Sequence, residues 1–203
     1  MNENRIIPIV VIEDAESSEA LAHALQAGGL TTIEVTLRTP AALEAIRRIR
    51  SAAPDLRVIA GTVLSSREAE ASLDAGAHAL VAPGLDPDLS HWCTGRGASL
   101  IPGVATPSEI MAAHRLGHRL LKFFPAGANG GISALIALQA PFAKLGLSFI
   151  PTGGISLTDV AGYLACPFVD AVGGSWIAPA DLIAAKNWGE IEKRASDAVR
   201  EAR

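Results

Sequence analysis

The feature that most restricts the fold of this chain is a repeated alternation of short β-branched runs with amphipathic helical segments. Eight apolar runs have the character of strands, and they cover residues 6–12, 31–37, 57–61, 77–82, 99–101, 120–124, 147–150 and 169–172. A segment with helical spacing of apolar residues follows each run, and several of these segments end at a glycine such as Gly28 or Gly117. Eight strand–helix units of about 25 residues each favour an α/β fold of the (β/α)8 TIM-barrel type, as a single domain over residues 1–203.

An open, doubly wound sheet is the main alternative to the barrel. That fold would need a glycine-rich phosphate loop after its first strand, where this chain has Ile12-Glu13-Asp14. No linker, low-complexity segment or change of composition divides the chain. The pattern therefore favours one barrel domain.

Composition excludes several classes of function. Hydrophobic residues make up 49% of the chain but aromatic residues only 4%, which suits the aliphatic core of a helix-covered parallel sheet. A net charge of −4 with mixed signs indicates no nucleic-acid partner. The two cysteines stand apart, which suits a reducing cytosol. The one long uncharged run, residues 123–143, is interrupted by prolines and glycines, so we expect no membrane association and a cytoplasmic location.

Lys122 interrupts the apolar run from Leu120 to Pro125. Burying an ammonium group is costly, and a desolvated lysine is the usual amine nucleophile of Schiff-base chemistry. The alternative is an edge-strand lysine whose stem lies on apolar surface while its charge reaches water. The run by itself favours this alternative, so the rest of the chain has to decide.

The second strand carries polar side chains with a period of two. Ile33, Val35 and Leu37 form an apolar face for packing on helices, so Glu34, Thr36 and Arg38 form the opposite, inward face. A carboxylate inside a barrel needs a partner, and a general base near a Schiff-base lysine is one explanation. The alternative is a cross-strand ion pair on a solvated face.

Glycines follow most of the remaining strands. Paired glycines stand at 153–154 and 173–174, after the last two strands, where barrels commonly bind phosphate through backbone N–H groups.

His114 and His118 have an i, i+4 spacing that can bind a metal, but no acidic residue stands beside them. We interpret them as surface histidines and expect no metal site.

Seven blocks of residues are together characteristic of one family. They are Glu34-Val35-Thr36-Leu37-Arg38-Thr39, Ala60-Gly61-Thr62-Val63-Leu64, Pro83-Gly84, Ile101-Pro102-Gly103, Lys122-Phe123-Phe124-Pro125-Ala126, Pro151-Thr152-Gly153-Gly154-Ile155-Ser156 and Gly173-Gly174-Ser175-Trp176. In this order and spacing, over nearly the whole chain, they resemble the 2-keto-3-deoxy-6-phosphogluconate (KDPG) and 4-hydroxy-2-oxoglutarate (KHG) aldolase family.

The resemblance implies a class I aldolase without metal or cofactor, on a (β/α)8 barrel, usually assembled as a homotrimer. Lys122 matches the family's Schiff-base lysine and Glu34 its general acid/base. The other matching positions bind substrate: Arg38 and Thr62 hold the pyruvate carboxylate, Pro83 and Phe124 wall the site, and Gly153, Gly154, Gly174 and Ser175 form the phosphate pocket, with Thr152 beside it.

The reaction that the resemblance favours is cleavage of 2-dehydro-3-deoxy-6-phosphogluconate to pyruvate and glyceraldehyde 3-phosphate. The alternatives are cleavage of 4-hydroxy-2-oxoglutarate, cleavage of the galactonate epimer, or a phosphate-binding barrel without imine chemistry. Val11-Ile12-Glu13 offers no basic residue near the end of the first strand, so phosphate would rest on backbone donors and Ser175. The chain begins almost at its first strand, and the short helix that closes the barrel bottom in longer members is expected to be missing or truncated.

Overall fold

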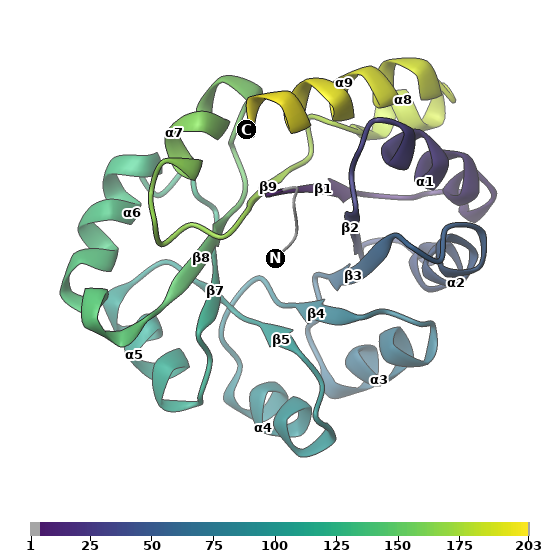
Figure 1. Ribbon diagram of the computed structural model, residues 1–203. Helices are drawn as coiled ribbons and strands as arrows, with labels where there is room; N and C mark the ends of the chain where they lie inside the picture. The colour runs from purple at the N-terminus through teal and green to yellow at the C-terminus, as the bar shows by residue number, and fades with distance from the viewer. Residues whose placement is uncertain (1–4, 203) are drawn as a thin grey trace.

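The computed structural model describes residues 5–202, and its parallel strands curl round an axis with the helices outside (Figure 1). The strands are β1 (Ile6–Val10), β2 (Thr32–Thr36), β3 (Arg57–Gly61), β4 (Ala79–Val81), β5 (Leu100–Ile101), β6 (Gly103–Val104), β7 (Leu120–Phe123), β8 (Ser148–Pro151) and β9 (Val172–Gly174). A six-stranded sheet has the order β5-β4-β3-β2-β1-β9, and a three-stranded sheet the order β6-β7-β8. The fold is therefore α/β with a strongly curled parallel sheet.

The two sheets approach each other at both of their edges. On one side only Pro102 separates β5 from β6, and its carbonyl oxygen accepts a hydrogen bond from the Lys122 backbone N–H. On the other side two isolated parallel bridges, Phe149 with Val169 and Thr152 with Gly173, connect β8 to the chain around β9.

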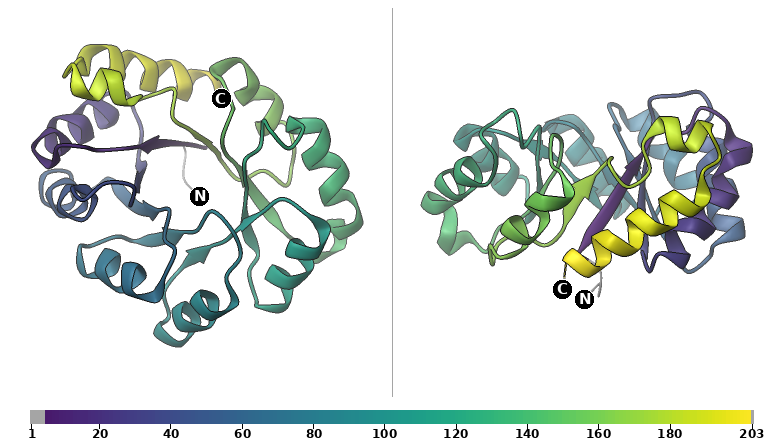
Figure 2. Two further views of the ribbon diagram at one scale, coloured as in Figure 1. Left: turned by 180° about the vertical axis from the view of Figure 1, so that it is seen from behind. Right: turned by 90° about the horizontal axis from the view of Figure 1, so that it is seen from above.

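The helices surround the strands (Figure 2). They are α1 (Ser18–Ala27), α2 (Ala42–Ala52), α3 (Ser66–Asp74), α4 (Pro87–Arg96), α5 (Pro107–Arg115), α6 (Gly131–Gln139), α7 (Val160–Leu164), α8 (Ala180–Ala184) and α9 (Trp188–Glu201), with 3-10 turns η1 (Ala15–Ser17), η2 (Ala140–Leu145) and η3 (Leu157–Asp159). Within residues 5–202, no helix is both long enough and apolar enough to cross a membrane.

Helix starts follow local sequence signals. Asp86 caps α4, where its carboxylate accepts a hydrogen bond from the Asp88 N–H at 2.9 Å, and Pro87 occupies the first turn. Thr106 and Glu109 form a reciprocal capping box at the start of α5. These signals place both helix starts where the sequence predicts them.

Three predicted elements differ from the structure. The predicted strand 99–101 continues to Val104 but is divided at Pro102, which has no N–H for the ladder. The predicted strand 169–172 lies later, at Val172–Gly174, because pairing with β1 begins at Val172. The helical segment predicted after the last strand is two helices, α8 and α9, because Lys186 has a φ of 53° and Asn187 caps α9. Residue 203 lies outside the described part of the chain.

The two faces of the curled sheet bury different residues. Outward side chains such as Ile33, Val35 and Leu121 are fully buried in the main core, which the helices cover. Inward side chains form a second apolar cluster whose largest members are Ile7, Ile59, Ile101 and Ile150. We call these four residues the isoleucine layer. It lies across the inside of the sheet and forms the floor of the site described next.

Candidate active site

Lys122 and Glu34 form a buried ion pair inside the curled sheet. The Lys122 Nζ lies 3.0 Å from the Glu34 Oε1, and the two residues are only 6% and 4% exposed. Alternation along β7 turns Lys122 inward while Leu121 and Phe123 pack in the main core, and Glu34 faces inward from β2 in the same way. Because β2 and β7 are not neighbours in a sheet, only the curling of the strands brings the pair together.

The space for Glu34 depends on a glycine in the neighbouring strand. Gly61 pairs with Thr36 in the β2–β3 register, one inward position beyond Glu34. A Cβ atom at Gly61 would lie 2.3 Å from the Glu34 Oε1 and 2.7 Å from its Cγ. Any larger residue at this position would therefore displace the carboxylate.

The isoleucine layer lies directly beneath the pair. A void of about 10 Å³ is enclosed by the layer, Val81, Glu34 and Lys122, which leaves room for about one water molecule at most. On another side, the Lys122 Nζ lies 5.2 Å from the centroid of the Phe124 ring, within the range of a cation–π contact. The pair is therefore shielded below and open above.

Above the pair is a pocket of about 230 Å³ at the carboxyl ends of the strands. It is lined by all eleven residues that the sequence analysis assigned to a site, namely Glu34, Arg38, Thr62, Pro83, Lys122, Phe124, Thr152, Gly153, Gly154, Gly174 and Ser175. The structure thus brings the predicted residues together, while the chemical role of each stays a prediction.

Thr62 has unusual backbone geometry within this pocket. Its φ of 60° lies in the left-handed region, which a β-branched residue rarely adopts. Such strain persists only where the surrounding structure holds it, and it concentrates at functional sites. Arg38 is exposed at the end of β2 and brings a permanent positive charge to the same pocket.

The glycines after β8 and around β9 meet on one side of the pocket. Gly153 and Gly154 have φ angles of 89° and 69°, which favour glycine. The bridge between Thr152 and Gly173 holds the two segments together, and a Cβ at Gly173 would lie 2.5 Å from the Thr152 Oγ1. Backbone atoms can therefore line the pocket closely on this side.

Four further residues of the described range line the pocket, and of these only Thr36 was predicted from the sequence to face inward. Ile9, Ile155 and Gly173 also line the pocket, and so does Thr36, whose hydroxyl donates a hydrogen bond to the Val10 carbonyl oxygen at 3.0 Å. Ile9 was not identifiable because its strand is apolar on both faces and shows no alternation. Gly173 belongs to the glycine pair 173–174 that the sequence places at a phosphate site, whereas Ile155 stood within a recognised block without a role of its own.

The histidines singled out in the sequence lie apart from the pocket. His114 Nδ1 lies 3.0 Å from Arg119 Nη1, and His118 Nε2 lies 3.1 Å from the Ser90 hydroxyl oxygen. Both histidines are partly exposed, and the partial burial of His118 lowers the pKa of its imidazole. Among the described residues, no three His, Cys, Asp or Glu side chains gather in an arrangement that could hold a metal ion.

Comparison with known proteins decides the family. The family model described as KDPG and KHG aldolase matches residues 1–194. The chain belongs to the KDPG and KHG aldolase family. It is accordingly a lyase of the aldolase class.

Individual members of this aldolase family match over almost their whole length. The chain is 43% identical to 2-dehydro-3-deoxy-phosphogluconate aldolase of Pseudomonas aeruginosa over 97% of this chain and 89% of that protein. It is 42% identical to the KHG/KDPG aldolase of Escherichia coli over 98% of this chain and 92% of that protein. One solved structure is a KDPG aldolase from Legionella pneumophila with pyruvate captured as a covalent carbinolamine. Its sequence is 38% identical to this chain, and the match covers 98% of this chain and 95% of the Legionella chain. The two structures superimpose with a TM-score of 0.93.

Proposed function

We propose that this aldolase cleaves 2-dehydro-3-deoxy-6-phosphogluconate to pyruvate and glyceraldehyde 3-phosphate through a Schiff base on Lys122. The observation that carries the proposal is the buried Lys122–Glu34 pair, 3.0 Å apart, at the floor of a pocket that also contains Arg38. The covalent carbinolamine in the Legionella pneumophila relative supports an amine nucleophile. No metal or cofactor is needed for this chemistry.

In the first half of the reaction, Glu34 accepts a proton from the Lys122 ammonium group. The neutral amine attacks the C2 ketone and forms a carbinolamine. Glu34 then protonates the C2 hydroxyl, which leaves as water and produces an iminium ion. Because the carboxylate is already 3.0 Å from the nitrogen, these proton transfers need little movement.

In the second half, Glu34 accepts the proton of the C4 hydroxyl, and the electrons of the C3–C4 bond move into the iminium ion. The aldehyde product leaves, and an enamine remains on Lys122. Protonation at C3 and addition of water then release pyruvate and restore the amine. The shielded floor beneath the pair limits competing water during these steps.

The remaining residues bind and orient the substrate in this proposal. Arg38 pairs with the carboxylate and Thr62 donates a hydrogen bond to it, which holds C2 against the amine. Pro83 and Phe124 wall the substrate. The phosphate lies at the glycine side, on Gly153, Gly154, Gly174 and Ser175, beside Thr152, where backbone N–H groups supply the donors.

We infer that residues 1–203 form one closed (β/α)8 barrel and that the protein is a cytoplasmic homotrimer. Closure is supported by the bridges between β8 and the chain around β9, and by the continuity of β5 and β6 across Pro102. Assembly is supported by large apolar side chains on the surface, of which Leu64 is 59% and Met111 51% exposed. The buried, unpaired cysteines suit a reducing compartment.

Cleavage of 4-hydroxy-2-oxoglutarate is a second candidate function, and one observation favours it. Arg38 and Lys122 supply the only cationic side chains of the pocket within the described part of the chain, and both already have roles at the keto-acid end. Selection for a phosphate therefore depends on backbone donors and Ser175. The Escherichia coli relative carries both activities in its name.

The substrate is tested by coupling pyruvate release to lactate dehydrogenase. The purified protein is assayed with 2-dehydro-3-deoxy-6-phosphogluconate, its galactonate epimer and 4-hydroxy-2-oxoglutarate. We expect the highest kcat/KM for the phosphogluconate, with measurable activity on 4-hydroxy-2-oxoglutarate. A preference for the galactonate epimer would show that the substrate is wrongly assigned.

The nucleophile is tested by trapping with pyruvate and borohydride, followed by mass spectrometry of the intact protein. Wild type and Lys144→Ala, which removes an exposed lysine, should both gain one reduced pyruvate adduct. Lys122→Ala should gain none. An adduct on Lys122→Ala would exclude this residue as the nucleophile, and no adduct on wild type would favour a barrel without imine chemistry.

A further inference from the structure

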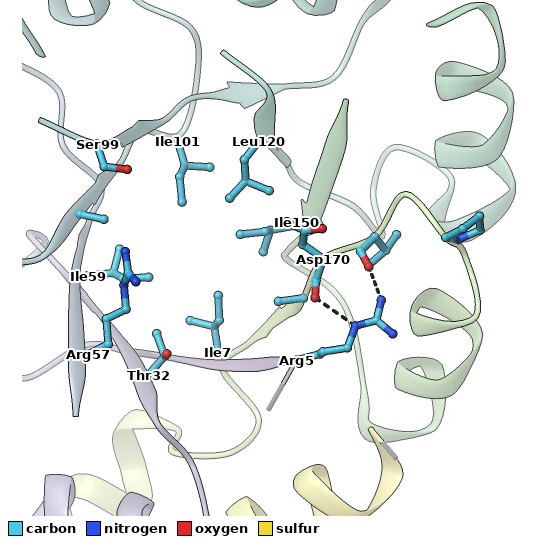
Figure 3. A pocket seen from close by; sticks show the side chains of 14 residues that line it. Arg5, Ile7, Thr32, Arg57, Ile59, Ser99, Ile101, Leu120, Ile150 and Asp170 are labelled. Carbon is cyan, nitrogen blue, oxygen red and sulfur yellow. Dashed lines mark hydrogen bonds between the residues drawn. The ribbon is translucent and has the colours of Figure 1, made fainter. Parts of the chain in front are cut away.

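A second and larger cavity opens at the amino ends of the strands, on the other side of the isoleucine layer from Lys122. Its volume is about 580 Å³, within the range of roughly 300–1,000 Å³ that small-molecule pockets occupy. We call it the N-terminal cavity and define it by Arg5, Arg57 and the four residues of the isoleucine layer, which all line it (Figure 3). None of these residues lines the pocket above Lys122.

The floor of the N-terminal cavity is apolar. Figure 3 shows Ile7, Ile59, Ile101 and Ile150 with their side chains toward the open space, together with Leu120. The alternation of the strands explains this, because Leu120 lies two residues before Lys122 and Ile59 two residues before Gly61 on the same inward faces. A ligand that fills this cavity must therefore offer hydrocarbon to the floor.

Among the residues that the structure describes, two arginines and one aspartate are the charged residues that line the cavity. Arg57 is exposed at the start of β3, and Figure 3 shows its side chain beside Ile59. On the opposite side, the Arg5 guanidinium donates to the carbonyl oxygens of Asp170 at 3.1 Å and Leu164 at 3.0 Å, and also to that of Val169.

Neither arginine has a carboxylate partner in the part of the chain that the structure describes. The Asp170 carboxylate, also at the rim, accepts a hydrogen bond from the Ser148 hydroxyl at 3.1 Å. Within residues 5–202, two guanidinium groups and one carboxylate line the rim, which favours an anion over a cation. Arg57 is the group available to bind it, because the Arg5 guanidinium already donates to three carbonyl oxygens.

From this apolar floor and cationic rim, we propose that the N-terminal cavity is a binding site for a small amphiphilic carboxylate. The hydrocarbon part lies on the isoleucine layer, and the carboxylate pairs with Arg57. Inorganic anions fit the rim but not the floor, and alkylammonium ions fit the floor but not the rim. The site is separate from the pocket that binds the substrate, although its floor is also the floor beneath Glu34 and Lys122.

Titration calorimetry with a series of straight-chain monocarboxylates tests both parts of the proposal. From acetate through butyrate to hexanoate, affinity should rise about fourfold for each added methylene, because each buries apolar surface on the layer. Hexanol and hexylammonium should bind about tenfold more weakly than hexanoate, because they cannot pair with a guanidinium group. Affinity that does not change with chain length would overturn the proposal.

Variants locate the bound acid. Arg57→Gln should weaken hexanoate binding about tenfold. Arg67→Gln, which removes an exposed arginine of α3 away from the cavity, should leave it unchanged. Arg38→Gln should also leave it unchanged, because Arg38 belongs to the other pocket. If Arg38→Gln rather than Arg57→Gln abolished binding, hexanoate would occupy the substrate pocket and the proposal would be wrong.

Discussion

Glu34 depends on the missing side chain of Gly61, because the carboxylate occupies the space that a Cβ there would fill. The two residues lie on paired strands, and the space beneath Glu34 holds about one water molecule at most, so a displaced carboxylate could move only toward the pocket above. At the residue scale, the position of Glu34, the proposed acid/base group, is therefore set by its neighbour as much as by its own backbone.

Gly61→Ala is expected to lower kcat/KM by at least about 10²-fold, because general acid/base catalysis of this kind contributes roughly 10²–10⁴-fold and requires a carboxylate in place. The lactate dehydrogenase coupled assay measures this. Gly95→Ala adds the same methyl group where no atom lies within 4 Å and should retain full activity. Thermal unfolding of both variants shows whether Gly61→Ala remains folded, and wild-type activity in this variant would contradict the argument.

Glu34→Gln is expected to lower turnover by about 10²–10⁴-fold yet still allow a borohydride-trapped pyruvate adduct on Lys122. The amide keeps the size of the side chain but cannot accept and return a proton. Turnover and trapping are measured on the same preparation, with Lys122→Ala as the variant that should lose both. Unchanged turnover in Glu34→Gln would remove Glu34 from its proposed role.

At the scale of elements, every second side chain of a strand points to the inside of the curled sheet. On β2, Thr32 lines the N-terminal cavity, Glu34 belongs to the pair, and Thr36 and then Arg38 line the pocket above Lys122. The same progression runs along β7 from Leu120 through Lys122 to Phe124. A shift of either strand by one residue would turn the catalytic candidates outward, so their function depends on register.

His118, in the turn after α5, makes the free energy of unfolding depend on pH. Burial lowers the pKa of His118 below its ordinary value of 6.5. The unfolded chain therefore takes up a proton more readily than the folded chain, and stability falls as the pH decreases below about 6.5. Above that range both states are neutral at this residue, and the contribution does not change.

Between pH 7.5 and about 5, the free energy of unfolding should therefore decrease less in His118→Gln than in wild type. Urea unfolding at several pH values measures this difference. Some slope should remain, because burial also lowers the pKa of His78, with the nearby Arg50 acting in the same direction. His91→Gln, which replaces an exposed histidine of α4, is the matched control. The same slope in His118→Gln and wild type would contradict the prediction.

At the scale of the whole molecule, the first and last helices pack together and join the two ends of the chain (Figure 1). A Cβ at Gly28 would lie only 2.4 Å from that of Ala195, so the end of α1 approaches α9 without a side chain between them. The outer layer of helices is therefore continuous where α1 meets α9. Large apolar side chains that remain exposed elsewhere on the surface are available for contacts between copies of the chain.

Sedimentation equilibrium should give a mass of three times the 21.0 kDa of one chain, in agreement with the proposed trimer. Replacing both Leu64 and Met111 by glutamate should shift the protein toward monomer, because a charge at an apolar contact loses its water without gaining a partner. Arg67→Glu, an exposed change on α3, should remain trimeric. A monomeric wild type would contradict the assembly.

The order of strands and helices and most of the candidate site were determined by local features of the sequence. Periods of two and of 3.6 residues, capping side chains such as Asp86, and a lysine inside an apolar run act over a few residues and can be read without a structure. The family blocks placed Arg38, Thr62 and the glycines in one expected site, and the structure brings these residues to one pocket.

Only the tertiary structure decided how distant strands meet. The 3.0 Å contact between Lys122 and Glu34, the inward position of Ile9, the later position of the last strand and the N-terminal cavity all depend on how the sheet curls and how its strands are paired. In a strand that alternates between polar and apolar residues, such as β2, the sequence indicates which face each residue occupies. The residue that it meets across the inside of the sheet depends on curvature and register, which arise from the packing of all the strands and helices together.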